Sequence, residues 1–134
     1  MVGTSTARTL TVKSAIYPKA GSLLTIQTSD GLVDLTAVTE VAHYVAMDES
    51  SRDAAGTLVA AAATVTGEPI GGVIHVLATA AEAWTAGDTL FVGALGLATS
   101  TAGSNKLLGV YLGAALTTAA DTLYAVNTVG AEQV

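Results

Sequence analysis

Residues Ala86 to Val126 read AGDTLFVGALGLATSTAGSNKLLGVYLGAALTTAADTLYAV. Short apolar runs in this segment, at Thr89 to Val92, Leu107 to Leu112 and Thr122 to Val126, alternate with turns rich in Gly, Ala, Ser and Thr. This alternation is typical of consecutive short antiparallel strands. The segment therefore predicts an all-β fold.

Much of the same pattern occurs about 66 residues earlier, where Ala20 to Ala60 read AGSLLTIQTSDGLVDLTAVTEVAHYVAMDESSRDAAGTLVA. In this alignment Ala20-Gly21 lies over Ala86-Gly87 and Leu24 lies over Leu90. We interpret the chain as one β unit used twice. The expected organisation is an N-terminal arm, residues 1–19, and a single β domain, residues 20–134, with an internal repeat at 20–60 and 86–126.

Composition favours a protein that shares its surface with partners. The 134 residues suffice for one domain that buries most of its chain surface. Hydrophobic residues make up 51% and charged residues 12%, and the mean hydropathy is +0.57. A monomer with so few charges would expose unusually much apolar surface, so we expect association with other copies or with a partner. The chain has no cysteine, which excludes disulfides and thiolate metal sites.

Charge is distributed unevenly along the chain. Arg8, Lys13 and Lys19 precede Ala20, whereas all eleven carboxylates follow it. Three spaced cations ahead of an acidic body do not match a nucleic-acid binder. The N-terminus lacks a secretory signal, and the most apolar windows are too short to span a bilayer, so we expect a soluble protein with neither nucleic acid nor membrane as partner.

No constellation of residues predicts catalysis. His43 and His75 lie in separate strand-like runs, without another ligand at metal-binding spacing. Asp48, Glu49 and Asp53 crowd one loop but lack the order of a calcium-binding loop, and are interpreted as a solvated acidic turn. No nucleophile elbow or phosphate-binding loop occurs. We therefore expect no enzyme activity, no cofactor and no metal.

Two segments before Ala86 have patterns of their own. Ile70 to Leu77 is nearly continuously apolar and predicts a buried strand that links the two copies. Ala80 to Trp84 contains good helix formers and predicts one or two helical turns. Trp84 has two interpretations: a plug at the end of a barrel or under a loop, or an anchor in an interface with a partner.

The second half of the chain resembles a known family. Ala83-Trp84-Thr-Ala-Gly87-Asp88-Thr-Leu90 is followed by Gly96-Leu97-Ala-Thr99, Leu108-Gly109-Val110 and Leu123-Tyr-Ala-Val126, and this order of motifs resembles tailed-phage capsid decoration proteins, also called cement proteins. The departure is Val110 to Gly113, where small residues are more usual. The resemblance implies a small β-barrel or β-tulip-like body, commonly trimeric, on the outer capsid surface of a virion, where it clamps adjacent subunits of the major capsid protein.

The arm is the expected grip of such a clamp. Thr9 to Lys13 alternates polar and apolar residues and predicts a strand, which can add to an exposed sheet edge of the capsid protein; a solvated, partly disordered start is the alternative. The expected partner-binding residues are Arg8, Thr9, Leu10, Thr11, Val12, Lys13 and Trp84. The alternative functions are a virion fibre module that binds a host-surface glycan, and a hydrolase with a polar pocket around His43 or His75.

Overall fold

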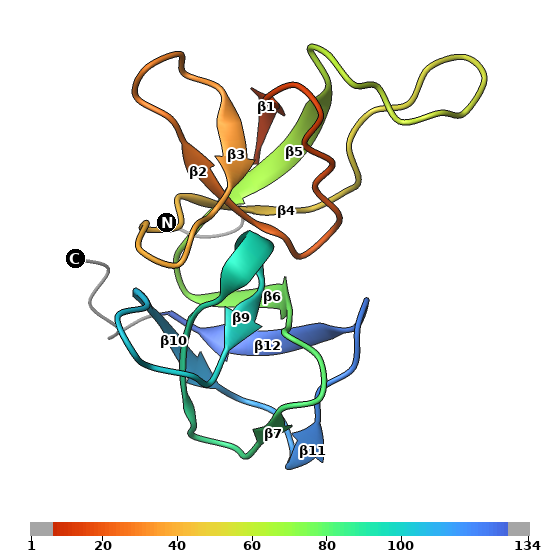
Figure 1. Cartoon of the computed structure of the whole chain (residues 1–134). Coiled ribbons are helices and arrows are strands. Elements are labelled where there is room, and N and C mark those ends of the chain that lie inside the picture. The colour runs from red at the N-terminus through yellow and green to blue at the C-terminus, as the bar shows by residue number, and fades with distance from the viewer. Residues whose placement is uncertain (1–6, 129–134) are drawn as a thin grey trace.

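Two five-stranded antiparallel sheets, one above the other in Figure 1, form the framework of the computed structural model, which describes residues 7–128. We call residues 7–69 the first half-barrel and residues 70–128 the second. The first contains β1 (Arg8–Thr11), β2 (Leu23–Ile26), β3 (Val33–Leu35), β4 (Tyr44–Ala46) and β5 (Thr64–Pro69). The second contains β6 (Val73–Leu77), β8 (Thr89–Val92), β9 (Ala98–Thr99), β10 (Leu107–Tyr111) and β12 (Leu123–Asn127).

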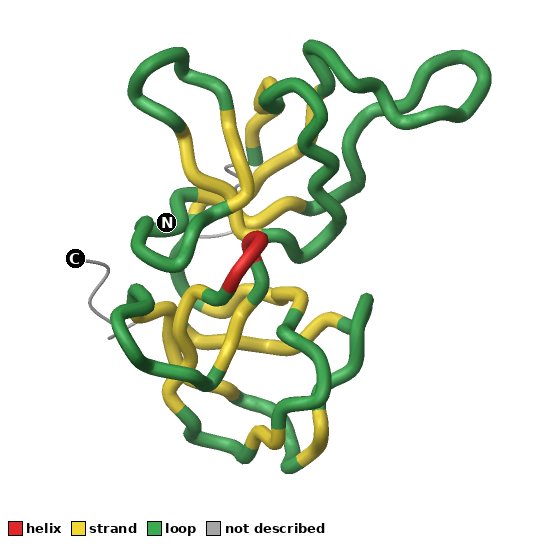
Figure 2. The backbone as a smooth tube through the Cα atoms, in the orientation of Figure 1, coloured by secondary structure: helices red, strands yellow, loops and turns green. Residues whose placement is uncertain are grey.

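The remaining elements are small. β7 (Ala83–Trp84) pairs with β11 (Leu116–Thr117) at the far end of the second half-barrel. One 3-10 turn, η1 (Ala94–Gly96), is the only helical element within residues 7–128, and Figure 2 shows it between the two sheets. The all-β prediction is confirmed.

The two sheets have the same topology. Their strand orders are β1-β5-β4-β2-β3 and β6-β12-β10-β8-β9, which correspond one for one. Each sheet also curls so that the residue after its first strand forms a parallel bridge to its last strand, Val12 to Val33 in one and Ala78 to Ala98 in the other. The glycines that begin the aligned segments, Gly21 and Gly87, have nearly equal φ angles of +92° and +91°.

The core crosses the junction between the half-barrels. One cluster of buried side chains, among them Val12, Leu24 and Val65, lies within the first half-barrel. The other fills the second half-barrel, and it includes Leu23 and Val45 from the first. The side chains on the inner faces of β2 and β4 thus belong to one cluster and those on the outer faces to the other. The two half-barrels are therefore packed together by apolar burial.

One expected element is wrong. Ala80 to Trp84 forms a turn followed by β7, with Ala81 at a φ of +64°, and not a helix. Alanine has the highest helix propensity, but propensity is a weak preference that tertiary packing overrides. Trp84 is buried here in the second half-barrel, and this packing requires an extended backbone.

The linking strand differs from its expected pattern in a smaller way. β6 occupies Val73–Leu77, inside the predicted range, but its burial alternates along the first four residues. Ile74 and Val76 point into the second half-barrel, whereas Val73 and His75 are exposed. One face of this strand is therefore available to solvent.

Candidate interaction surfaces

The expected partner-binding residues Arg8 to Lys13 lie in and directly after β1, the first strand of the first half-barrel. Arg8, Thr9 and Thr11 are exposed, while Leu10 and Lys13 are half-buried. Val12 is only 1% exposed and belongs to the core. The side chain of Val12 therefore cannot reach a partner without unfolding this part of the chain, whereas those of Arg8, Thr9 and Thr11 are accessible.

β1 already pairs with a strand of its own chain. Its antiparallel partner is β5, with Arg8 opposite Gly67 and Thr11 opposite Thr64. Val12 N–H donates to Ala63 O at 2.8 Å, and the next residue, Lys13, donates in the opposite direction to Val33 O at 2.9 Å. Because backbone groups alternate in direction along a strand, the N–H groups of Thr9 and Thr11 point away from β5.

The outward edge at Thr9 and Thr11 is the part of β1 that a further strand can reach. An exposed strand edge is a template for strand addition. The arm segment that precedes it, residues 1–6, lies outside the described residues. Within 7–128 the predicted arm is thus the edge strand of a sheet, and another chain can pair only with its outer side.

Lys13 forms a local ion pair at the end of this strand. Its Nζ lies 3.4 Å from Asp30 Oδ2, in the turn between β2 and β3. The hydrogen bond from Leu32 N–H and the charge of Lys13 lower the pKa of Asp30. Lys13 therefore stabilises the turn beside β1, although a pair this exposed contributes little.

Trp84, the other expected contact, lies in the core of the second half-barrel. It is 1% exposed, and its ring makes edge-on contacts with Tyr111 and Tyr124, with centroid distances of 5.3 and 5.4 Å. Such edge-to-face pairs add to the stability that area burial gives. The geometry supports the plug interpretation of Trp84 within one chain.

The carboxylate of Glu82 holds this aromatic cluster in place. Its Oε1 accepts hydrogen bonds from Trp84 Nε1 and from Ser100 N–H, both at 2.9 Å, and its Oε2 accepts one from Thr99 Oγ1 at 2.6 Å. Burial alone would raise the pKa of Glu82, but these hydrogen bonds outweigh it and lower the pKa. The ionised carboxylate is therefore the form that the fold stabilises.

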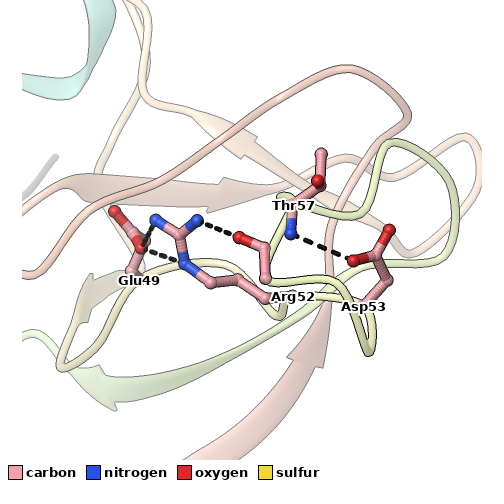
Figure 3. Close-up of polar contacts among 5 residues, drawn as sticks. Glu49, Arg52, Asp53 and Thr57 are labelled. Atoms are coloured by element: carbon pink, nitrogen blue, oxygen red, sulfur yellow. Dashed lines mark hydrogen bonds and ion pairs between the residues drawn. The ribbon is translucent and has the colours of Figure 1, made fainter.

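The acidic segment between β4 and β5 forms a long loop that projects from the first half-barrel, as Figure 1 shows. Its conformation is held by contacts within the loop: Arg52 pairs with Glu49 and donates to Gly56 O, and Asp53 Oδ1 accepts from the Thr57 N–H at 3.0 Å (Figure 3). Asp53 Oδ1 also accepts from the Ala55 N–H at 2.9 Å. These contacts fit the predicted solvated acidic turn.

The two histidines lie in separate surroundings and form no common site. His43 Nδ1 accepts the Ile26 N–H at 3.1 Å, which is a structural contact. His75 borders a cleft of about 200 Å³ whose lining is mainly apolar, with Glu68 as its other ionisable residue. No group of three His, Cys, Asp or Glu side chains that could hold a metal occurs within residues 7–128.

Exposed apolar side chains mark surfaces that sequence reasoning missed. Val73, Leu123 and Met47 surround the cleft beside His75, at the junction of the half-barrels. Tyr17 and Leu95 border a second cleft of about 280 Å³ at the junction. Val110 and Leu112 lie on the outer side of β10 and directly after it, 37% and 47% exposed. The run Leu107 to Leu112 has no alternation of polar and apolar residues, so the sequence does not show which of its side chains face outward.

Comparison with known proteins gives a structural match only. No protein-family model and no curated protein sequence matches the chain significantly. Among solved structures, the N base of the head fiber protein gp8.5 of bacteriophage phi29 is similar, with a TM-score of 0.64 over 91% of this chain and 93% of that one, at 17% sequence identity. The two chains share a fold. Within residues 7–128, no helix has the length and apolar character needed to cross a membrane.

Proposed function

We propose that this chain is a structural protein of a phage head, which lies on the outer capsid surface and clamps adjacent subunits of the major capsid protein. The observation that carries the proposal is the similarity, over 91% of the chain, to the base of a phage head fiber. The proposed role is non-catalytic and needs no cofactor. It requires accessible surface for the shell and for other copies, and the exposed apolar side chains supply such surface.

The proposed contact with the capsid protein is the start of β1. Arg8 and Thr9 are exposed there, and the Thr9 N–H points away from β5. An extended capsid segment can pair with this edge through backbone hydrogen bonds. If several copies are joined, each presents one such edge, and weak single contacts sum to stable attachment.

Thr9→Pro tests the contact, because proline removes the outward N–H and is tolerated at the solvent side of an edge strand. Thr9→Ala is the matched control, since it shortens the same side chain and keeps the N–H. We expect Thr9→Pro to weaken binding to purified heads in a co-sedimentation assay while Thr9→Ala binds like the parent chain, with equal circular dichroism spectra for all three. Equal binding by both variants would exclude the β1 edge as the contact.

A second candidate function is the base of a head fiber, which the same structural similarity favours. A clamp that links neighbouring subunits is expected to raise the temperature at which heads release their DNA, whereas a fibre base is expected to bind without this effect. Dye-detected DNA release from heads with and without added protein separates the two. A glycan array tests the further possibility that the module binds a host-surface glycan.

A further inference from the structure

The junction inside the chain covers one face of the first half-barrel. Leu23 and Val45 lie on the outer sides of β2 and β4, and they are 0% and 5% exposed because the second half-barrel packs on them. The junction also contains a backbone hydrogen bond, from Leu77 N–H at the outer edge of β6 to Gly21 O, at 2.9 Å. A face of one half-barrel thus receives the edge of the other.

The corresponding face of the second half-barrel is exposed. The strand pairings give the correspondence. In the first sheet Leu23 pairs with Val45 and Leu24 with Tyr44. In the second sheet Thr89 pairs with Val110 and Leu90 with Gly109. Val110 therefore corresponds to Val45, and Thr89 corresponds to Leu23.

These two counterparts are exposed. Val110 is 37% exposed, and Thr89 is exposed beside it. Leu112 adjoins them at 47% exposure, and Phe91 is half-buried on the neighbouring strand. We call Thr89, Phe91, Val110 and Leu112 the β10 face.

The corresponding edge of the first half-barrel is exposed as well. The equivalent bridges of Val12 and Ala78 make Thr11 the counterpart of Leu77, one residue earlier in each strand. Thr11 is exposed, and its N–H points away from β5 as that of Leu77 points away from β12. Gly87, the counterpart of Gly21, has the same backbone conformation and nothing within 4 Å of the place its Cβ would take.

We propose that a second copy of this chain covers the β10 face. The Thr11 edge of one copy packs against Gly87 and the β10 face of the next, and this contact repeats between chains the junction that each chain already has within itself. Such a contact is heterologous, because different surfaces meet, so a rotation that closes gives a ring. The inference does not depend on the phage-head role.

The chemistry of the repeated junction makes it weaker than the internal one. Thr11 replaces Leu77 and Thr89 replaces Leu23, so two apolar side chains of the internal junction become hydroxyl-bearing ones between copies. Val110 and its counterpart Val45 are both valine, so Val110 is the apolar centre of the proposed contact between copies. Association is therefore expected to be reversible and concentration-dependent. The edge at Thr9 remains outside it, because its counterpart His75 makes no backbone hydrogen bond across the internal junction within the described residues.

Disulfide cross-linking tests the orientation, because the chain has no cysteine of its own. Ala20 and Leu77 line the same cleft at the internal junction, and their counterparts are Ala86 and Thr11, both exposed. An equimolar mixture of Thr11→Cys and Ala86→Cys is expected to form a cross-linked dimer under mild oxidation, while each variant alone does not. The control mixture replaces Thr11→Cys by Thr57→Cys, in the exposed β4–β5 loop, and is expected to stay uncross-linked.

Light scattering after size exclusion tests the face itself. Val110→Glu introduces a charge at its apolar centre and is expected to weaken association by about tenfold or more. Met47→Glu, at another exposed apolar side chain, leaves association unchanged. A parent chain that stays monomeric at all concentrations, or Val110→Cys that cross-links to itself in a face-to-face dimer, would overturn the proposal. Thr9→Pro leaves association intact, which separates this inference from the proposed capsid contact.

Discussion

Glu82 joins three parts of the second half-barrel through one carboxylate. The donors of its hydrogen bonds are Trp84 in β7, Thr99 in β9 and Ser100 after it. All three are donors, so only the ionised carboxylate accepts from each of them without competition from a proton of its own. The aromatic cluster of Trp84 therefore depends on a charge that its surroundings hold in place.

Glu82→Gln is expected to lower the free energy of unfolding at pH 7 by about 1–3 kcal/mol, because the amide NH₂ group faces donors and leaves at least one of them unsatisfied. The pH dependence has a definite sign. The folded-state pKa lies below the ordinary value of 4.5, so the stabilisation is complete above that value and is lost as the pH falls through the folded-state pKa.

Urea unfolding between pH 7 and pH 3 checks this. The difference between the parent chain and Glu82→Gln is expected to shrink toward acid. Glu68→Gln, at a half-buried carboxylate in the first half-barrel, serves as control and is expected to change the free energy little. A difference that stays constant with pH would contradict the role of the charged carboxylate.

At the scale of elements, β1 shows what local sequence predicts and what it does not. The alternation at Thr9 to Lys13 predicted a strand, and Arg8–Thr11 forms one. Its partner β5 is more than fifty positions away in sequence, and nothing local identifies that pairing. The alternation that predicts β1 is a local signal, whereas the exposure of Val110 depends on which strands close around it.

The error at Ala80 to Trp84 has the same physical origin. The alanines are good helix formers, but the side chains that decide the backbone there, Glu82 and Trp84, find their partners in β9, β10 and β12. Among the partner-binding residues expected from the sequence, Arg8 and Thr9 are accessible in the structure. The sequence did not separate them from Val12, whose contact with the core is made through tertiary packing.

Val12→Ala is the variant that tests β1 as part of the core. Val12 is 1% exposed in the first cluster, so we expect a loss of about 1–3 kcal/mol in the free energy of unfolding. Val110→Ala makes the same chemical change at an exposed strand position and is expected to alter stability by about 0.5 kcal/mol or less in the monomer. Thermal and urea unfolding at low protein concentration compare the two. Equal small effects would mean that β1 detaches readily from the first half-barrel.

For the whole molecule, the junction couples two half-barrels of equal topology into one folding unit. Leu23 and Val45 belong to strands of the first half-barrel, but their side chains are buried in the core cluster of the second. Four backbone hydrogen bonds between described residues also cross the junction, from Ile70 to His43, Leu77 to Gly21, Gly96 to Thr36 and Lys106 to Val38. Neither half-barrel keeps its apolar surface covered when the other unfolds, so a single cooperative unfolding transition is expected.

Gly96→Ala and Gly31→Ala form a matched pair that measures this coupling. Both glycines have a positive φ, +71° and +72°, so alanine carries the same backbone cost of about 1–2 kcal/mol at either position. A Cβ at Gly96 would lie 2.6 Å from Leu23 O of the first half-barrel, whereas one at Gly31 would meet nothing within 4 Å. The added Cβ at Gly96 would force the half-barrels apart, which adds about 1–3 kcal/mol of overpacking cost.

Denaturant unfolding measures the difference between the two variants. We expect Gly96→Ala to be less stable than Gly31→Ala by that amount, with one transition in the parent chain and in Gly31→Ala. Equal losses in the two variants, or two separate transitions in the parent chain, would mean that the half-barrels fold independently and that the junction only holds them side by side.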